Sequence, residues 1–322
     1  MDRIYKEIQL EVKKAKNVLI ISHRKPDGDT LGAAIALKIW LGDMGKDVDL
    51  ACVDKPAESF SFLPFMDEYR QEFEIHDYDL IFIVDAGASY MTDFEKKYPN
   101  LFTAGVPIIN IDHHASNDFF GKINLVDPVA ASATVIIYRM FEFFGMDIDS
   151  DIATALLTGI YNDTGSFMHS NTDQEVYMIA SKLMALGAKV ADISSAMFNT
   201  KPVSTLRLWG RVLESAYKTN EDIVLSVIKE EDYEMTDSGP SELSGVIDYL
   251  NMVPSNMFTM LLTEDRKGQL KASMRTRRAD LDLSKIAANF GGGGHPRASG
   301  FTMKGTVDDF RESMIDSLHH DS

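Results

Sequence analysis

The first half of the chain alternates short apolar runs of strand length with longer helical patterns, and this alternation restricts the folds that the chain can adopt. Helical periodicity covers 30–45 and continues through three segments between 131 and 187. The apolar runs are NVLIIS (17–22), DVDLACV (47–53), YDLIFIVDA (78–86), VPIINID (106–112) and the shorter INLVD (123–127). Strands that alternate with helices predict an α/β domain whose mostly parallel sheet has helices on both faces.

The pattern changes in the last third of the chain, after a helical connector with Pro202 near its middle. Strand-like runs occupy 222–228, 256–264, 269–275 and 298–303, and helical patterns occupy 241–253, 282–290 and 307–320. We therefore predict a large first domain, a linker and a smaller second α/β domain. Their boundaries are 1–188, 189–216 and 217–322.

Charge and cysteine content limit the functional classes. The 322 residues carry a formal net charge of −17, which disfavours a protein that holds long duplex nucleic acid on a basic face. A short phosphorylated substrate stays compatible, because bound divalent cations would reverse the local field. Cys52 is the only cysteine, and no run of about 18 apolar residues occurs. We expect a cytoplasmic protein without disulfides or membrane contact.

Aspartates and histidines follow three of the predicted strands. They are His23, Asp27 and Asp29 after the first run, Asp85 after the third, and Asp112, His113 and His114 after the fourth. The carboxyl ends of parallel strands meet at one edge of an open sheet, where ligands bind. Asp163, in GIYNDTGSF, is a fourth candidate because it follows a helical segment and precedes a glycine.

Crowded carboxylates repel one another, and a divalent cation removes that repulsion. Aspartate and histidine without sulfur favour Mn²⁺ or another borderline metal. Asp27 and Asp29 flank a glycine, so each could serve one of two neighbouring ions, as a two-metal hydrolase needs. Each motif alone is more often a solvated turn or a helix cap. The four motifs together favour a metal site.

A glycine-rich segment, NFGGGGHPRASG (289–300), is the second chemical signal. Successive exposed amides can form a nest that binds anions, and neighbouring histidine and arginine side chains add donors for phosphate. The alternative is a loop that only permits a tight turn before the last strand. The candidate anion-binding residues are Gly292, Gly293, Gly294, His295 and Arg297, with Arg275 at the end of a predicted strand.

These motifs resemble those of a known family. The segments SHRKPDGDTLG, IVDAG, IDHH and NDTGSF look like the four sequence blocks of the DHH phosphoesterases, and GGGGHPRASG is similar to the hallmark of DHHA1-type C-terminal domains. The length and the domain organisation are most similar to the nanoRNase/pAp-phosphatase group. That resemblance implies a DHH domain and a DHHA1 domain with the active site in the cleft between them.

The resemblance also implies roles for individual residues. One Mn²⁺ would be held by His23, Asp27 and Asp85, and the other by Asp29, Asp85, His113 and Asp163. His114 would contact the substrate as the catalytic residue, and Asp112 would support a histidine. The glycine loop with His295, together with Arg275, would hold the terminal phosphate or nucleotide.

We therefore expect an Mn²⁺-dependent phosphodiesterase in which activated hydroxide attacks phosphorus. Its substrates would be short single-stranded RNA oligonucleotides cut to mononucleotides, and 3′-phosphoadenosine 5′-phosphate (pAp). Alternatives are a cyclic or linear dinucleotide phosphodiesterase, a pyrophosphatase, a single-strand DNA exonuclease and a non-catalytic nucleotide-binding protein. Ala86 replaces a hydroxyl residue common in the family, and 86–100 lacks the usual arginine, so substrate choice stays open. A homodimer is one oligomeric state that the sequence allows.

Overall fold

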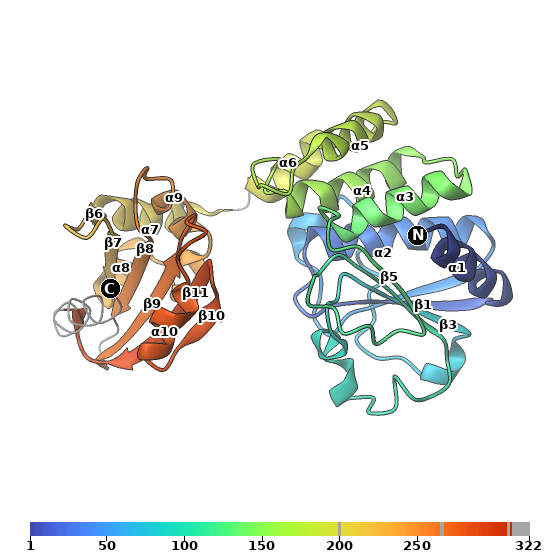
Figure 1. The fold of residues 1–322 in the computed structure, drawn as a ribbon, viewed down its shortest axis with the longest axis horizontal. Helices are drawn as coiled ribbons and strands as arrows, with labels where there is room; N and C mark the ends of the chain where they lie inside the picture. Colours follow the sequence, from blue (N-terminus) through green and yellow to red (C-terminus); the bar gives the residue numbers. More distant parts are fainter. Residues whose placement is uncertain (199–200, 265–266, 308–309, 311–322) are drawn as a thin grey trace. The chain divides into compact units, whose positions relative to one another are not determined.

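A computed structural model describes residues 1–198, 201–264, 267–307 and 310 of the chain. The chain divides into two compact units, Met1–Thr200 and Lys201–Ser322 (Figure 1). Most of the helix predicted for 307–320 lies outside the described residues. Within the described ranges, no helix is both long enough and apolar enough to span a bilayer.

The first unit contains a five-stranded sheet whose neighbouring strands are all parallel, as the sequence predicted. Its strands are β1 (Asn17–Ser22), β2 (Asp47–Ala51), β3 (Leu80–Val84), β4 (Ile108–Asp112) and β5 (Ile123–Val126). The spatial order is β2-β1-β3-β4-β5, so the chain winds outward in opposite directions from β1 and β3. A crevice forms at the carboxyl ends of such strands, where ligands bind in open α/β sheets.

The two faces of this sheet are covered differently. The α-helices pack on one face with side chains such as Val18, Ile20 and Phe82 (Figure 1). They are α1 (Asp2–Lys14), α2 (Gly28–Asp43), α3 (Ala133–Phe144), α4 (Ser150–Asp163), α5 (Gln174–Ala185) and α6 (Val190–Phe198). Aromatic residues such as Phe73 and Phe94 cover the other face. The helices on that side are short 3₁₀ segments, η2 (Ile75–Asp77), η3 (Ser89–Thr92) and η4 (Phe94–Lys96), and η1 (Glu58–Phe60) follows β2.

Helix α2 lies very close to α4. A Cβ atom at Gly32 would lie 2.2 Å from the carbonyl oxygen of Ala155, so only glycine permits this approach. Nearly all of α2 is buried, which explains why its sequence is apolar on every side. The contact fixes α2, which begins immediately after Asp27, against the helix that ends in Asp163.

The second unit contains a six-stranded mixed sheet with the order β10-β11-β9-β8-β7-β6. The strands are β6 (Tyr217–Lys218), β7 (Val224–Lys229), β8 (Thr259–Glu264), β9 (Gln269–Arg275), β10 (Gly293–His295) and β11 (Ala298–Lys304). Only β7 and β8 pair in parallel. Helix α10 (Leu283–Asn289) packs on one face, whereas α7 (Val203–Glu214), α8 (Glu230–Thr236) and α9 (Val246–Leu250) pack on the other.

The single helix predicted over 241–253 is wrong. A 3₁₀ helix, η5 (Pro240–Leu243), precedes α9, and Gly245 lies between them with a φ of +92°. A right-handed helix cannot continue through that backbone conformation. Helix α8 is an element that the sequence pattern did not reveal.

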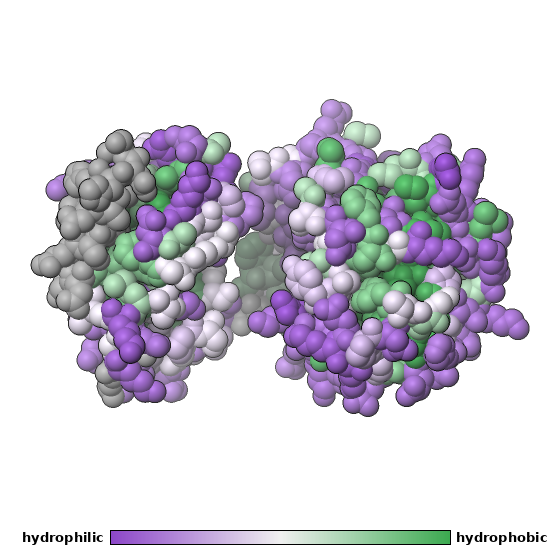
Figure 2. Space-filling model, turned by 60° about the horizontal axis from the view of Figure 1, so that its bottom comes forward, coloured by the Kyte–Doolittle hydropathy of each residue, from purple (hydrophilic) through white to green (hydrophobic). Residues whose placement is uncertain are grey.

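Hydrophilic residues dominate the faces of both units that Figure 2 shows, with smaller apolar patches between them. This distribution agrees with 25% charged residues and a net charge of −17.

Candidate metal centre

The predicted Asp and His side chains of the first unit come together because three parallel strands end at the same edge. Ser22 of β1 pairs with Val84 of β3, and Val84 pairs with Ile111 of β4. The residues that follow these strands therefore emerge side by side, at the point where the strand order changes direction.

Asp27 and Asp29 are fixed by helix termini. Asp27 is the N-cap of α2, and its Oδ1 accepts hydrogen bonds from the backbone N–H groups of Asp29 (3.0 Å) and Thr30 (3.1 Å). Asp29 is fully buried, and its carboxylate accepts the N–H groups of Ala133 (2.6 Å) and Thr134 (3.0 Å) at the start of α3. The positive end of that helix therefore faces the Asp29 carboxylate.

Gly159 of α4 permits the buried position of Asp29. A Cβ atom there would lie 2.4 Å from both Asp29 Oδ1 and Thr134 Oγ1. Helices α2, α3 and α4 thus meet around one carboxylate, and a larger residue at Gly159 would separate them.

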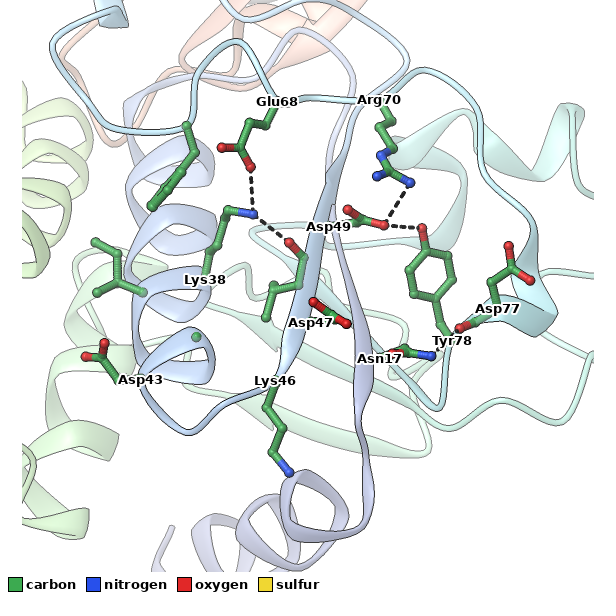
Figure 3. A pocket seen from close by; sticks show the side chains of 14 residues that line it. Asn17, Lys38, Asp43, Lys46, Asp47, Asp49, Glu68, Arg70, Asp77 and Tyr78 are labelled. Atoms are coloured by element: carbon green, nitrogen blue, oxygen red, sulfur yellow. Dashed lines mark hydrogen bonds and ion pairs between the residues drawn. The ribbon is translucent and has the colours of Figure 1, made fainter.

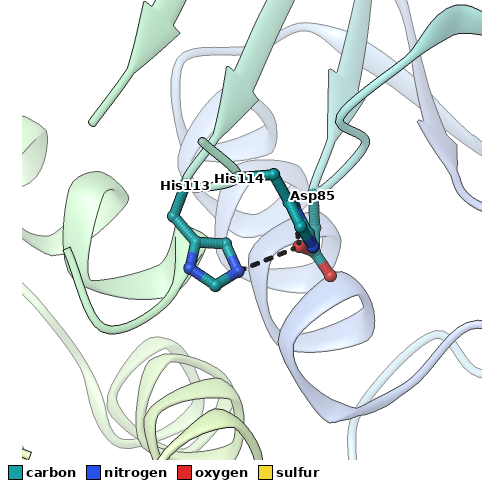
Figure 4. Close-up of side chains that lie close together, drawn as sticks. All are labelled: Asp85, His113 and His114. Carbon is teal, nitrogen blue, oxygen red and sulfur yellow. Dashed lines mark ion pairs between the residues drawn. The ribbon is translucent and has the colours of Figure 1, made fainter. Parts of the chain in front are cut away.

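Asp85 occupies the centre of the cluster. It is 3% exposed and has a φ of +54°, an uncommon conformation for a non-glycine residue that points to a functional position. Its Oδ2 accepts a hydrogen bond from Thr30 Oγ1 at 2.6 Å and lies 3.3 Å from His23 Nε2. Its Oδ1 lies 3.5 Å from His113 Nε2 (Figure 4).

Three groups of side chains in the described part of the chain have ligand atoms within 4.8 Å of one another. They are His23 with Asp27 and Asp85, Asp29 with His113 and Asp163, and Asp85 with His113 and His114. The first two groups contain all six residues that the sequence analysis expected to bind metal.

The geometry of two buried atoms at the centre of the cluster suits a shared cation better than a direct hydrogen bond between them. Asp85 Oδ1 and His113 Nε2 are buried, and neither has a hydrogen-bond partner among the described residues. Asp163 Oδ2 is 3.1 Å from His113 Nε2, yet the pair lacks hydrogen-bond geometry. Buried polar atoms that converge without pairing cost free energy, which a bound cation would recover. The donor set of carboxylates and imidazoles suits a divalent metal.

The crowding of carboxylates and histidines also shifts the pKa values of the cluster residues. Burial would lower the pKa of His23, but Asp85 outweighs burial and raises the pKa to about 9. Burial also opposes protonation of His113, but Asp163 and Asp85 raise its pKa to about 11. Burial would raise the pKa of Asp85, whereas its contacts with His113 and His23 hold it well below the ordinary value. Burial and neighbouring carboxylates raise the pKa of Asp29 well above normal. A divalent cation bound here would interact favourably with the same carboxylates and would bind the neutral form of both histidines.

His114 and Asp112 form a separate pair beside the cluster. His114 Nδ1 lies 2.7 Å from Asp112 Oδ1, and because the carboxylate oxygen is the acceptor, His114 donates its Nδ1–H. Asp112 is fully buried, and its Oδ2 accepts a second hydrogen bond from Asn117 Nδ2 at 2.6 Å. The His114 side chain is 40% exposed, so its ring remains accessible while Asp112 fixes its orientation.

Two residues that position the cluster aspartates were not predicted from the sequence. Thr30 donates to Asp85, and its only signal is its position directly after Asp29 at the start of a helix. Asn117 donates to Asp112 and also to the carbonyl oxygen of Ala86, which follows Asp85. No motif marks Asn117, because its contact with Ala86 depends on how β3 and β4 pair.

Two of the anion-binding candidates of the second unit, Arg275 and His295, lie on the same face of its sheet. Strand register places Arg275 opposite Ala298 and Ala298 opposite His295, so a small residue separates the two larger side chains. In the next row Gly300 lies opposite Gly293. The guanidinium of Arg275 also lies near a carboxylate, with its Nε 3.8 Å from Asp248 Oδ1.

The glycine segment is partly a strand rather than a loop, because β10 forms a hairpin with β11. A Cβ atom at Gly292 would lie 2.3 Å from the carbonyl oxygen of Gly300, and one at Gly294 would lie 2.6 Å from that of Ala298. Gly293 has open space around it. Arg297 donates its backbone N–H to His295 Nδ1 at 3.2 Å. At least two of these glycines are therefore required by the packing of the hairpin itself.

The first unit also has a cavity of about 690 Å³ away from the Asp/His cluster, beside β2 and α2 (Figure 3). Two of its basic side chains are already in ion pairs: Lys38 with Glu68 at 2.9 Å, and Arg70 with Asp49 at 2.8 Å. Tyr78 donates to Asp49 as well. The lining also contains Asp43, Asp47 and Asp77, so acidic side chains outnumber basic ones there and the cavity does not suit a phosphorylated ligand.

Sequence comparison supports the two-domain organisation. The N-terminal domain of the DHH family matches residues 17–160, and the DHHA1 domain matches residues 224–320. A curated relative from Thermus thermophilus, named bifunctional oligoribonuclease and PAP phosphatase NrnA, is 31% identical over 319 residues. The alignment covers 97% of this chain and 92% of the relative. A relative of the same name from Bacillus subtilis (strain 168) is 24% identical, with 89% of each chain covered.

Structural comparison finds the same fold in solved proteins. The crystal structure of an exopolyphosphatase-related protein from Bacteroides fragilis has a TM-score of 0.87 and 25% identity, and the match covers 99% of this chain and 96% of that one. RecJ in complex with Mn²⁺ from Thermus thermophilus shares the fold at a TM-score of 0.51 and 13% identity, covering 94% of this chain and 52% of RecJ. The motifs, the domain matches and the relatives agree, and the chain belongs to the DHH family.

Proposed function

We propose that the protein is an Mn²⁺-dependent phosphodiesterase that degrades short RNA oligonucleotides to mononucleotides and removes the 3′-phosphate of pAp. The observation that carries this proposal is the pair of converging Asp/His groups that share the edge of one parallel sheet. The names of the curated relatives support the substrate class, and the Mn²⁺ complex of RecJ supports the metal.

Two ions would be held by the two groups. His23, Asp27 and Asp85 would bind one ion, and Asp29, His113 and Asp163 would bind the other. Asp85 would contribute to both, because its two oxygens face His23 and His113 respectively. When bound, the ions would activate water and stabilise the negative charge that develops at phosphorus.

His114 would supply the proton for the leaving oxygen. Its Nδ1–H is engaged by Asp112, so the proton available to a substrate is on Nε2. The hydrogen bond to Asp112 raises the pKa of His114, which favours the protonated form that a general acid needs. Asp112 itself would hold the ring in one orientation and balance the charge of the imidazolium.

The second unit would bind the phosphate or nucleotide away from the scissile bond. Arg275 offers charged donors to phosphate, and Gly293 on the same sheet has open space around it. His295 lies on the same sheet face. We propose that Arg275 and His295 bind the same substrate on which the Asp/His cluster acts.

The experiment is a substrate panel. Purified protein with Mn²⁺ is tested on labelled RNA of two to five nucleotides, pAp, linear and cyclic dinucleotides, and pyrophosphate. Turnover of the short RNA and pAp is expected, and His114→Ala should abolish it while circular dichroism stays unchanged. Preferential turnover of cyclic dinucleotides or pyrophosphate would contradict the proposed substrate class. Failure on every substrate by folded, metal-bound protein would contradict catalysis itself.

A further inference from the structure

The second unit contains a cavity of about 240 Å³ beside strands β8 and β9. Residues between 240 and 247, from η5 to the start of α9, line one side of it, and Tyr233 of α8 lines it as well. Thr263 of β8 and Lys271 of β9 belong to the sheet side, where strand register places them opposite each other. We call this cavity the Tyr233 pocket.

The hydroxyl group of Tyr233 is buried and has no hydrogen-bond partner among the described residues. The residue is 7% exposed, and its ring packs in the same core as Val246 and Leu261. Thr263 lies beside the hydroxyl, but the pair lacks hydrogen-bond geometry. Burial raises the pKa of Tyr233 to about 12, so the hydroxyl keeps its proton at neutral pH. A buried donor without an acceptor costs free energy, which a ligand oxygen in the pocket would recover.

Three serine hydroxyl groups around the pocket are unpaired as well. Ser241, Ser244 and Ser273 line it, and within the described ranges none of their side chains forms a hydrogen bond. Ser226 on the neighbouring strand β7, by contrast, donates to the carbonyl oxygen of Val212 at 2.8 Å. The Tyr233 pocket therefore gathers hydroxyl donors that the fold itself does not use.

The charged residues that line the pocket are both basic. They are Lys271 and Arg275, and the lining includes no carboxylate. Lys271 has no ion pair with any residue that the structure describes, whereas Arg275 lies near Asp248. Glu242, in the adjoining segment, instead accepts the backbone N–H of Gly239 at 2.7 Å. The pocket thus has the opposite charge balance to the cavity beside β2.

This combination of groups indicates the class of ligand. Hydroxyl and ammonium donors around a space without carboxylates suit an oxyanion that has several acceptor oxygens. At about 30 Å³ for each water molecule in the liquid, the pocket has the room of roughly eight waters. A phosphate group fits this space and can accept hydrogen bonds from several of the donors at once.

We propose that the Tyr233 pocket binds a phosphate group, with Lys271 as its counter-ion and the Tyr233 hydroxyl as a hydrogen-bond donor. The site is distinct from the one assigned to Arg275 and His295, because four residues of β9, or about 14 Å of strand, separate Lys271 from Arg275. Two sources offer this chemistry. One is inorganic phosphate, and the other, which rests on the proposed function, is a further phosphate of the bound RNA.

Calorimetry with inorganic phosphate tests the pocket without relying on catalysis. The full-length protein is used without metal and with His295→Ala, so that neither a bound cation nor His295 holds the anion. Tyr233→Phe removes only the unpaired hydroxyl, and Lys271→Gln removes only the charge. Each should weaken phosphate binding roughly tenfold or more, as expected for the loss of a hydrogen bond to a charged group.

Tyr249→Phe and Lys218→Gln are matched controls within the second unit. Tyr249 is 51% exposed on α9, Lys218 pairs with Asp222 at 2.7 Å, and neither lines the pocket. Both variants should bind phosphate as tightly as the His295→Ala protein. Tyr233→Phe should also leave the Tm unchanged or raise it, because it replaces an unpaired buried hydroxyl by an apolar group of the same shape.

Steady-state kinetics with Mn²⁺ separates the two sources of phosphate. If RNA supplies the group, Lys271→Gln should raise KM roughly tenfold for RNA of three to five nucleotides. KM for pAp is the internal reference, because the metal centre and Arg275 with His295 already account for its two phosphates. If Lys271→Gln loses inorganic phosphate while both KM values stay the same, free phosphate is the ligand.

Two outcomes would overturn the proposal. Inorganic phosphate could fail to bind the His295→Ala protein, or Tyr233→Phe and Lys271→Gln could bind it as tightly as Lys218→Gln does. Both outcomes are read from binding alone. A protein that binds phosphate in the pocket but never hydrolyses RNA would contradict the proposed function and not this inference.

Discussion

Replacing Asp27 by asparagine separates two roles of one side chain. Asp27 Oδ1 caps α2 through the N–H groups of Asp29 and Thr30, and asparagine caps helices about as well as aspartate does. The carboxylate also lies within 4.8 Å of the ligand atoms of His23 and Asp85. Asp27→Asn should therefore preserve the helix cap while removing one charge from the cluster.

The expected change in the stability of the metal-free protein is small. Two carboxylates 4.8 Å apart repel by roughly 0.9 kcal/mol in water and by ~3.5 kcal/mol at an effective dielectric constant of 20. The Asp27 side chain is 46% exposed, so we take a value of about 1 kcal/mol, near the lower limit. Loss of a negative charge at a helix N-terminus costs about 0.3–1 kcal/mol. The two effects offset each other, and the net change should stay below about 0.5 kcal/mol.

The expected loss of metal response is large. Mn²⁺ at a hundred times its dissociation constant should stabilise the wild type by about 2.7 kcal/mol. For a unit of this size that corresponds to a rise in Tm of roughly 5–11 °C. Asp27→Asn should lose most of this rise in thermal unfolding followed by circular dichroism with and without Mn²⁺.

Asp149→Asn provides a matched control. Asp149 caps α4 in the same way, through the N–H groups of Asp151 (3.0 Å) and Ile152 (2.8 Å), and it lies outside the cluster. This variant should keep the full response to Mn²⁺. The reasoning would be refuted if Asp27→Asn kept the response as well, or if it destabilised the metal-free protein by more than about 2 kcal/mol.

Three other predictions concern Asp112, Gly32 and Asp79. Asp112→Asn should lower kcat by about 10- to 100-fold and leave the affinity for Mn²⁺ unchanged, because it disturbs the orientation of His114 and not the metal ligands. Steady-state kinetics and calorimetry measure these two quantities. Gly32→Ala should lower the unfolding free energy by about 1–3 kcal/mol, since its Cβ atom would collide with Ala155, whereas Gly42→Ala, which has open space, should not lower it. Hydrogen bonds from two backbone N–H groups lower the pKa of Asp79 in the folded protein. The contribution of Asp79 to stability is therefore present above its pKa in the unfolded chain and is lost as pH falls through its lower pKa in the folded protein. Denaturant unfolding should therefore show a shallower loss of stability below about pH 4 for Asp79→Asn than for the wild type, and equal slopes would contradict this assignment.

The strands of the first unit could be predicted because they are buried on both faces. A parallel strand between two layers is apolar over its buried length, as in VLII of β1 and LIFIV of β3. The polar residues that follow such runs mark the functional edge of the sheet. Sequence reasoning therefore identified the residues of the Asp/His cluster before any contact between them was known.

Other features depend on contacts that no local pattern encodes. The partners of Asp29 at the start of α3 are more than 100 residues away in the chain. Helix 241–253 was predicted from apolar spacing, but Gly245 adopts a left-handed conformation and ends that pattern. Gly292 and Gly294 looked like an anion-binding loop, whereas hairpin packing against β11 already requires them. In each case tertiary packing decided a feature that the sequence left open.

The most direct measurement of the central proposal is RNA turnover during metal titration. Chelator-treated protein is given increasing Mn²⁺, and bound metal and hydrolysis of a labelled RNA trinucleotide are followed in the same samples. Hydrolysis should be absent without metal and should rise in proportion to the chains that hold two ions. Full occupancy by Mn²⁺ without release of mononucleotides, or equal turnover in excess chelator, would contradict the account.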